Sequence, residues 1–439
     1  MNVEEEINLP EDVDMEGNNE NAIGVGVSEE NKRKVYLPGQ KLEEGEELIH
    51  DPSAYVMFHE ASTGAPCLSF DIIWDSLGNN RSTFPLTAYV VAGTQSDRMN
   101  GNRVIVMKLS NMNKTQVEDS DVEDDSDDEE KDTSNPIMET IKLKHHGAVN
   151  RIRAAVCNNA MLTAVWSEVG KVSILDVKSH LQTLDDPIEL TLRKKNNKVG
   201  ENIKPVFVFN GHQSEGYAMD WCPTVPGMLA TGDCRRNIHV WTPDDSSWKV
   251  DQRPLIGHTD SVEDLQWSPS ERHVLASASI DKTIRIWDTR EVPTKACKLF
   301  ITAHESDVNV ISWNRNDPLI VSGGDDGFLH VWDLRQFKTG NSIATLKHHM
   351  EPVTTVEWHP TESSVFASGG ADNQIALWDL AVERDTEADS EEIGELPPQL
   401  LFIHQGQTDI KELHWHRQIP GLIISTANSG FNMFRTISV

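Results

Sequence analysis

Short runs in which apolar and polar residues alternate make up most of the chain, and turn-forming residues separate them. Residues 274–280 (VLASASI) and 283–288 (TIRIWD) are one such pair, with Asp281 and Lys282 between them. Alternation over six or seven residues predicts strands that bury one face, and the short break predicts a turn between neighbouring strands. The pattern therefore predicts an all-β fold made of short strands.

The strand pattern repeats about every 46 residues, and three series of aromatic residues mark the repeat. The first series is Trp221, Trp267, Trp313 and Trp358, with spacings of 46, 46 and 45 residues. The second is Trp241, Trp287, Trp332 and Trp378, and the third is His212, His258, His304 and His349. A repeat of this length with Gly-His and Trp-Asp pairs is the signature of a β-propeller, in which four strands make one blade.

Weaker repeats complete the predicted ring. Starts near residues 67, 145, 212, 258, 304, 349 and 404 give a seven-bladed β-propeller. Two of these repeats place Leu175 or Phe434 where the second series has tryptophan. Because an unpaired edge strand invites aggregation, we expect residues 54–60 (AYVMFHE) to pair with the last blade as its outer strand and close the ring.

These motifs resemble the WD40-repeat family. The resemblance implies a polar network in each blade, in which a turn aspartate bonds the histidine while serine and the tryptophan indole satisfy the remaining groups. The expected network residues are His258, Ser277, Asp281 and Trp287; His304, Ser322, Asp326 and Trp332; and His349, Ser368, Asp372 and Trp378. Arg235 stands at the aspartate position before Trp241, so that blade must rewire its network or lose it.

Acidic residues dominate the charge, since 70 Asp and Glu against 39 Lys and Arg give a formal net charge of −31. We interpret residues 1–50 as a disordered acidic tail and residues 51–439 as the propeller, with acidic loops inserted at 118–132 and 383–395. Insertions into a repeat array commonly mark its binding face, which predicts a basic partner here. The expected partner-binding residues are Glu118, Asp119, Asp121, Glu123, Asp124, Asp125, Asp127, Asp128, Glu129, Glu130, Glu387, Asp389, Glu391, Glu392, Pro397 and Pro398.

Further stretches narrow the resemblance. Residues 55–70 and 396–404 (LPPQLLFIH) are similar to the histone-binding subfamily of WD proteins, and the acidic insert and the ending SGFNMFRTISV are similar to the glutamate-rich WD-repeat proteins. The latter similarity implies a chaperone that escorts a basic protein, ribosomal protein L3 above all, for large-subunit biogenesis. Two alternatives stay open. One is a histone chaperone for core histones, and the other is a ubiquitin-ligase substrate receptor, because residues 287–290 and 332–335 resemble Trp-Asp-x-Arg endings that dock to the ligase adaptor.

Several other functions are disfavoured by the sequence. The negative charge would repel a nucleic-acid backbone, and no window approaches the eighteen apolar residues of a membrane span. Five scattered cysteines indicate no zinc site, and His414 and His416 lack carboxylate or cysteine partners at useful spacing. Ser, His and Asp recur with the blade period, which favours a structural role over a catalytic triad. We therefore expect a monomeric binding protein without catalytic residues, cofactor or metal.

The family resemblance and the basic cluster at residues 32–34 predict a protein of the nucleus and nucleolus, with some in the cytoplasm. Ser120 and Ser126 each precede a glutamate by three residues. This spacing predicts phosphorylation by an acid-directed kinase, which mass spectrometry of the native protein would detect. The added phosphates would deepen an already negative field.

Overall fold

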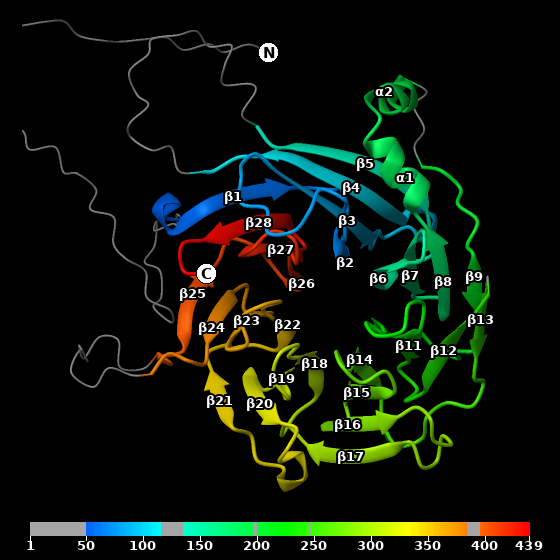
Figure 1. Ribbon diagram of the computed structural model, residues 1–439, viewed down its shortest axis with the longest axis vertical. Coiled ribbons are helices and arrows are strands. Elements are labelled where there is room, and N and C mark those ends of the chain that lie inside the picture. The colour runs from blue at the N-terminus through cyan, green and yellow to red at the C-terminus, as the bar shows by residue number, and fades with distance from the viewer. Residues whose placement is uncertain (1–49, 116–134, 196–199, 246, 384–395) are drawn as a thin grey trace, which may run out of the picture. The chain divides into compact units, whose positions relative to one another are not determined.

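A computed structural model describes residues 50–115, 135–195, 200–245, 247–383 and 396–439. His50–Val439 form one compact unit. This unit holds seven four-stranded antiparallel sheets arranged as the blades of a ring (Figure 1). The prediction of an all-β, seven-bladed propeller is therefore confirmed.

The first four blades follow the chain in order. Blade I contains β2 (Cys67–Ile73), β3 (Leu86–Thr94), β4 (Arg103–Met112) and β5 (Ile137–Lys144). Blade II contains β6 (Val149–Cys157), β7 (Ala160–Ser167), β8 (Lys171–Asp176) and β9 (Phe207–Phe209). Blade III contains β10 (Ala218–Trp221), β11 (Leu229–Gly232), β12 (Ile238–Asp244) and β13 (Ser247–Val250). Blade IV contains β14 (Val262–Trp267), β15 (Val274–Ser279), β16 (Thr283–Asp288) and β17 (Cys297–Thr302).

The last three blades include the point of closure. Blade V contains β18 (Val308–Trp313), β19 (Leu319–Gly324), β20 (Phe328–Asp333) and β21 (Ala344–Lys347). Blade VI contains β22 (Val353–Trp358), β23 (Val365–Gly370), β24 (Ile375–Asp379) and β25 (Leu400–His404). Blade VII contains β26 (Ile410–Trp415), β27 (Leu422–Ala427), β28 (Gly430–Thr436) and β1 (Tyr55–Ala61). Short 3-10 segments lie at Pro52–Ala54, Met99–Gly101 and Phe337–Thr339.

The ring closes through a strand from the beginning of the folded unit. β1 pairs antiparallel with β28, with Phe58 opposite Phe434 and Ala61 opposite Phe431. The prediction that residues 54–60 complete the last blade is confirmed. The innermost strands of successive blades also contact one another, including β26 of blade VII and β2 of blade I. Neighbouring blades therefore support each other around the whole circle.

The two open ends of the ring differ. The connection that precedes each first strand meets the turn between the second and third strands of the same blade, as the contact between His258 and Asp281 shows. We call this side the histidine end. Connections between third and fourth strands lie at the opposite side, because antiparallel strands reverse direction at every turn. We call that side the insert end.

The polar network of blade IV uses every hydrogen-bonding atom of its histidine. His258 Nδ1 lies 2.8 Å from Asp281, and Nε2 lies 2.6 Å from the Ser277 hydroxyl. The Trp287 indole donates to the same hydroxyl at 2.8 Å. Burial lowers the pKa of His258 despite the opposing aspartate. A neutral ring that donates from Nδ1 and accepts at Nε2 satisfies all of these contacts.

Blades V and VI repeat this arrangement. His304 contacts Asp326 at 3.0 Å and Ser322 at 2.8 Å, and Trp332 donates to Ser322. In blade VI the corresponding contacts join His349 to Asp372 at 3.1 Å and to Ser368 at 2.7 Å, while Trp378 donates to Ser368 at 2.9 Å. Each network links the connection that enters a blade to the middle of that blade.

Blade III keeps the network with other residues, so its expected rewiring is observed. His212 contacts Asp233 and the Thr231 hydroxyl, each at 2.8 Å, and Trp241 donates to that hydroxyl at 2.9 Å. Asp233 lies two positions before Arg235, where the sequence pattern did not place an aspartate. Its carboxylate also accepts the backbone N–H of Arg235 at 2.9 Å.

Blade VII departs from the repeat, because its entry histidine is replaced. Gln407 accepts the Ser425 hydroxyl at 2.5 Å. His404, near the predicted start of the last repeat, ends β25 of blade VI instead. It lies 2.8 Å from the Tyr55 hydroxyl and 3.1 Å from the Asn432 amide, so it joins blade VI to the closing strands.

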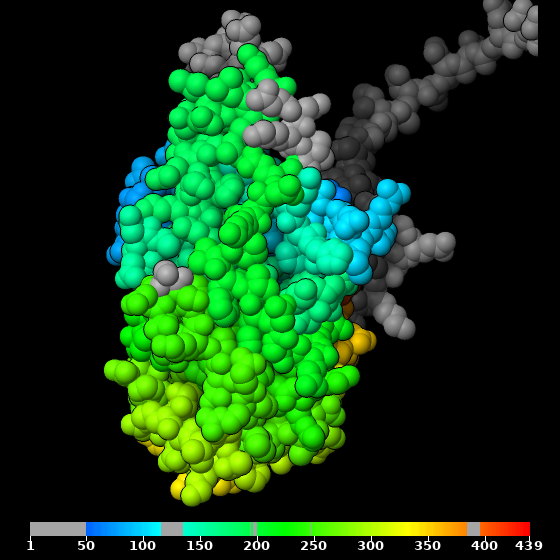
Figure 2. Space-filling view, turned by 90° about the vertical axis from the view of Figure 1, so that its right-hand side faces the viewer, coloured from blue at the N-terminus to red at the C-terminus, as the bar shows by residue number. Residues whose placement is uncertain are grey.

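Helices α1 (Lys178–Leu184) and α2 (Pro187–Lys195) interrupt blade II, and the strand pattern gave no sign of them. They lie between β8 and β9 and project from the outer edge of the ring (Figures 1 and 2). Leu184 and Leu190 are buried against blades I and II. Within the described residues, no helix is long and apolar enough to cross a membrane.

Replacing Asp326 with alanine should destabilise blade V. The change removes the partner of buried His304 and the acceptor of the Phe328 N–H, which lies 3.0 Å away. We expect a loss of about 1–3 kcal/mol in the free energy of unfolding, measured by urea denaturation. Glu305→Ala, at an exposed neighbour, is the control and should leave stability nearly unchanged. Equal unfolding curves for Asp326→Ala and the parent would contradict the network in this blade.

Candidate protein-binding site

Three acidic segments join the ring at one end of three adjacent blades. Residues 116–134 lie between β4 and β5 of blade I, and residues 384–395 lie between β24 and β25 of blade VI. Residues 1–49 precede β1 of blade VII. A third strand ends and a fourth strand begins at the insert end, so all of the attachment points lie there. The repeat pattern alone did not show that these segments share one side.

Most of the predicted binding residues fall outside the described residues. This holds for every acidic partner-binding residue named above, and for Ser120, Ser126 and the basic cluster at 32–34. Pro397 and Pro398 are described, and both are half-buried beside the blade VI insert. The structure therefore gives the attachment of the acidic runs and the surface between them.

The blade I insert begins against the closing strand. The Thr115 N–H donates to the Val56 carbonyl at 3.1 Å, and the Thr115 hydroxyl accepts the Phe58 N–H at 2.6 Å. The Asn111 side chain donates to the Asn135 carbonyl at 2.7 Å, which ties the two ends of this insert together. The insert is therefore fixed to blade VII as well as to its own blade.

The blade VI insert is tied in the same way. The Asp379 N–H donates to the Gln399 carbonyl at 2.9 Å, and the Gln399 side chain donates to the Val382 carbonyl at 3.2 Å. The Leu400 N–H donates to the Pro397 carbonyl at 3.0 Å. These bonds hold the chain ends on either side of the acidic run at a fixed place on the ring.

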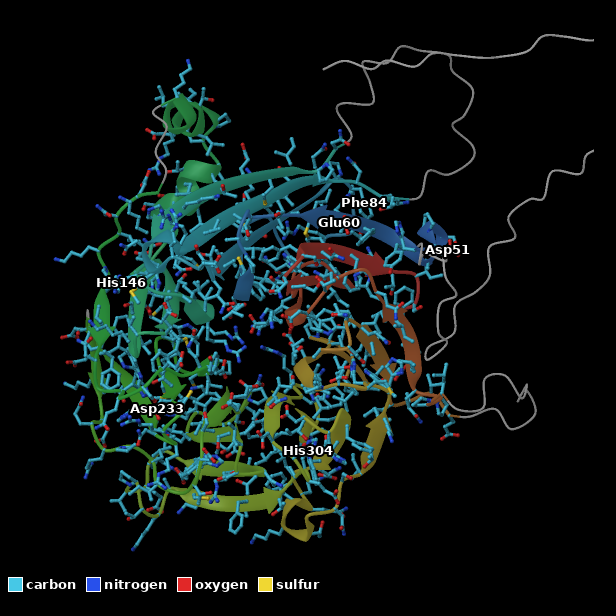
Figure 3. The ribbon with its side chains drawn as sticks, turned by 180° about the vertical axis from the view of Figure 1, so that it is seen from behind. Asp51, Glu60, Phe84, His146, Asp233 and His304 are labelled. Atoms are coloured by element: carbon cyan, nitrogen blue, oxygen red, sulfur yellow. The ribbon has the colours of Figure 1, made fainter. Side chains whose placement is uncertain are left out.

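Aromatic side chains occupy the surface between the two inserts. The Tyr55 ring lies 5.4 Å from both Phe58 and Phe402, and His50 lies 5.1 Å from Phe58. Phe58 and Phe402 are half-buried, so their remaining apolar surface faces solvent. Asp51, just before β1, marks the entry of the chain into this region (Figure 3). We call Phe58, Leu401 and Phe402 the rim strip.

Burial keeps the polar centre of this region uncharged. Burial, with a smaller contribution from His50, lowers the pKa of His404 to about 3. The neutral imidazole stacks on Phe434 with ring centres 4.1 Å apart, and it contacts the Tyr55 hydroxyl. The rim strip therefore rests on a rigid, neutral base, and the charge available for a partner comes from the acidic segments around it.

A second cluster of charged residues lines the central channel, a cavity of about 550 Å³. The Glu412 carboxylate accepts the Ser69 hydroxyl and the Phe70 N–H at 2.7 and 2.8 Å. Arg151 and Arg153 each donate to it at 2.7 Å. One carboxylate of blade VII therefore binds blades I and II. The regular blade pattern gave no signal for this cluster, because its members come from distant repeats.

His414 belongs to this cluster, and the expectation that it lacks carboxylate partners was wrong. Its Nδ1 lies 3.0 Å from Glu357 of blade VI, and its Nε2 lies 3.7 Å from Glu412. Burial alone would lower the pKa of His414, but these carboxylates outweigh it and raise the pKa to about 10. His416 instead has its pKa lowered to about 3, first by burial and then by Arg81. Among the described residues, no histidine, cysteine or carboxylate group forms a metal-binding cluster.

Family models match two parts of the chain. Residues 45–113 match the model that describes histone-binding protein RBBP4 and a component of the CAF1 complex. Residues 250–288, 295–333 and 340–379 match the WD domain, G-beta repeat. The first match includes β1 to β4, and thus the closing strand that contributes Phe58 to the rim strip.

Three similar proteins match the chain along most of its length. Ribosome assembly protein rrb1 of Schizosaccharomyces pombe is 43% identical over 99% of this chain and 92% of its own. Protein HEAT STRESS TOLERANT DWD 1 of Arabidopsis thaliana is 44% identical over 92% of each chain. Glutamate-rich WD repeat-containing protein 1 of Dictyostelium discoideum is 44% identical over 92% of this chain and 85% of its own.

The charge on His414 should give a measurable pH dependence of stability. A histidine whose folded pKa is raised stabilises the fold fully below its unfolded pKa of about 6.5, and this contribution disappears as the pH rises through the folded value of about 10. The unfolding free energy of the parent minus that of His414→Gln should therefore shrink between pH 6 and pH 10.5. Urea denaturation measures it, with exposed His146→Gln as the control. A constant difference across this range would show that His414 is not charged.

Proposed function

This chain belongs to the family of ribosome assembly and glutamate-rich WD-repeat proteins, and on that basis we propose that it acts in ribosome assembly as a binding protein rather than an enzyme. The observation that carries the proposal is the 43% identity to a ribosome assembly protein over nearly the whole chain. The blade networks support a non-catalytic role, because their Ser, His and Asp residues hold one blade after another together.

The partner that we propose is a basic ribosomal protein, with ribosomal protein L3 favoured. Eleven acidic residues at 118–132 and seven at 383–395 join the same end of adjacent blades. Single surface ion pairs contribute only about 0–1 kcal/mol each, whereas a summed field attracts a Lys- and Arg-rich segment over a longer range. The rim strip between the inserts offers apolar contact to a folded part of the same partner. Charge would thus capture the partner, and shape would hold it.

The match at residues 45–113 favours histone binding as the second candidate. A core histone is also basic and would meet the same inserts. The ubiquitin-ligase alternative is supported by Arg290 and Arg335, whose side chains are 65% and 70% exposed and pair with Asp288 and Asp333 at 2.7 Å. Affinity purification followed by mass spectrometry separates the three, since each predicts a different partner: one ribosomal protein, core histones, or a ligase adaptor.

A role in ribosome assembly predicts that the protein concentrates in the nucleus and nucleolus. Large-subunit precursors assemble there, so an escort must reach them with its cargo. Imaging of the tagged full chain in growing cells measures this distribution. A signal confined to the cytoplasm throughout growth would contradict the proposed place of delivery.

Neutralising the blade I insert should weaken capture of the basic partner. We propose replacing the eleven acidic residues of 118–132 with serine and asparagine, which leaves all described strands unchanged. The association rate with purified ribosomal protein L3 should fall at least about ten-fold at low salt, because electrostatic steering supplies such factors. The rate should also depend less on salt than that of the parent. Stopped-flow fluorescence at two salt concentrations measures both effects.

A matched pair of variants tests whether the position of the charge matters. The first variant replaces Glu387, Asp389, Glu391 and Glu392 of the blade VI insert with their amides. The control replaces four exposed acidic residues at the histidine end: Asp97, Asp260, Glu305 and Glu351. Each loses four charges, but only the first should slow association beyond the effect of net charge. Equal rates for the two variants would overturn the proposed site.

A further inference from the structure

Two arginines stand at the insert-end mouth of the central channel. Arg315 follows β18 of blade V, and Arg417 follows β26 of blade VII. Both line the cavity and are exposed to it. Arg417, and to a lesser degree burial, lowers the pKa of Arg315 to about 10, so the two cations are close enough to repel each other. Within the part of the chain that the structure describes, neither guanidinium has a hydrogen-bond or ion-pair partner.

The nearby acidic groups do not neutralise this pair. Glu357 is already bound to His414 at 3.0 Å. Asp220 accepts the Trp267 N–H at 2.7 Å, and burial raises the pKa of its carboxyl to about 7. Deeper in the channel, Arg151 and Arg153 are paired with Glu412, which shows how the other guanidiniums of this cavity are satisfied. The mouth therefore carries uncompensated positive charge in a chain of net charge −31.

The remaining wall of the same mouth is apolar. Trp74 of the β2–β3 connection is 47% exposed, and Val156 at the end of β6 is 52% exposed. Pro223 and Pro226 of blade III continue this surface along the cavity. A mouth with two cations on one side and large apolar side chains on the other suits a ligand that has both features.

We propose that this mouth binds an acidic peptide segment of a partner protein, with carboxylates on Arg315 and Arg417 and an apolar side chain against Trp74 and Val156. Charge complementarity sets the sign of the ligand, because a guanidinium binds a carboxylate through two parallel hydrogen bonds. A small inorganic anion would leave the apolar wall without a function. This partner is distinct from the basic one proposed above, and the two sites carry opposite charge at the same end of the ring.

Selection of peptides on the full chain tests this site. A random twelve-residue library displayed on phage should yield peptides that combine Asp or Glu with a large apolar residue. The strongest of these is synthesised, and calorimetry measures its Kd for the parent and for the double variant Arg315→Gln/Arg417→Gln. We expect binding at least ten-fold weaker in the double variant. The double variant Arg98→Gln/Arg235→Gln, which changes two exposed arginines at the histidine end, is the matched control and should bind like the parent.

Two further measurements keep the outcomes distinct. Trp74→Ala should also weaken the peptide, whereas inorganic phosphate should compete poorly with it. Enrichment without acidic residues, equal affinity in the Arg315→Gln/Arg417→Gln variant, or efficient competition by phosphate with no effect of Trp74→Ala would overturn the proposal. Binding of ribosomal protein L3 to the same variants is measured separately. Its failure would count against the escort function and leave the peptide site standing.

Discussion

The carboxylate of Glu412 bonds to three blades at once, and the ring is continuous because of such contacts. It accepts hydrogen bonds from Ser69 and Phe70 of blade I and from two arginines of blade II, while it belongs to blade VII. Burial would raise the pKa of Glu412, but Arg153 and Arg151 hold it well below its usual value. A buried carboxylate is costly unless such partners surround it, so this contact requires blades I, II and VII to be in place together.

Features that repeat could be predicted from the sequence, and features that occur once could not. The period of tryptophan and histidine gave the seven blades, and an alternating run at 54–60 gave the closing strand. Asp233 was missed because the blade III turn places its carboxylate two positions earlier than expected. Glu357 was missed as a partner of His414 because the two lie 57 residues apart and meet only where blades VI and VII adjoin. Helices α1 and α2 are short and stand outside the repeat.

The distribution of charge gives the two ends of the ring different roles. At the histidine end, the blade networks use aspartates for internal bonds, as Asp281 and Asp372 do. At the insert end, acidic runs join blades VI, VII and I, which leaves their charge available to a partner. The channel between the ends carries Arg151, Arg153 and His414, whose charges Glu412 and Glu357 balance. A strongly acidic chain thus keeps a nearly balanced centre.

The pairing of β1 with β28 also has a consequence during synthesis of the chain. β1 is among the first strands to leave the ribosome, but its only strand partner in the described fold lies at residues 430–436. Until those residues emerge, the rim strip lacks the sheet that supports it, and contacts so distant in sequence form late. A truncated chain would therefore carry the acidic runs without the surface between them. Competence to hold a folded partner would then be reached only by molecules whose translation has finished.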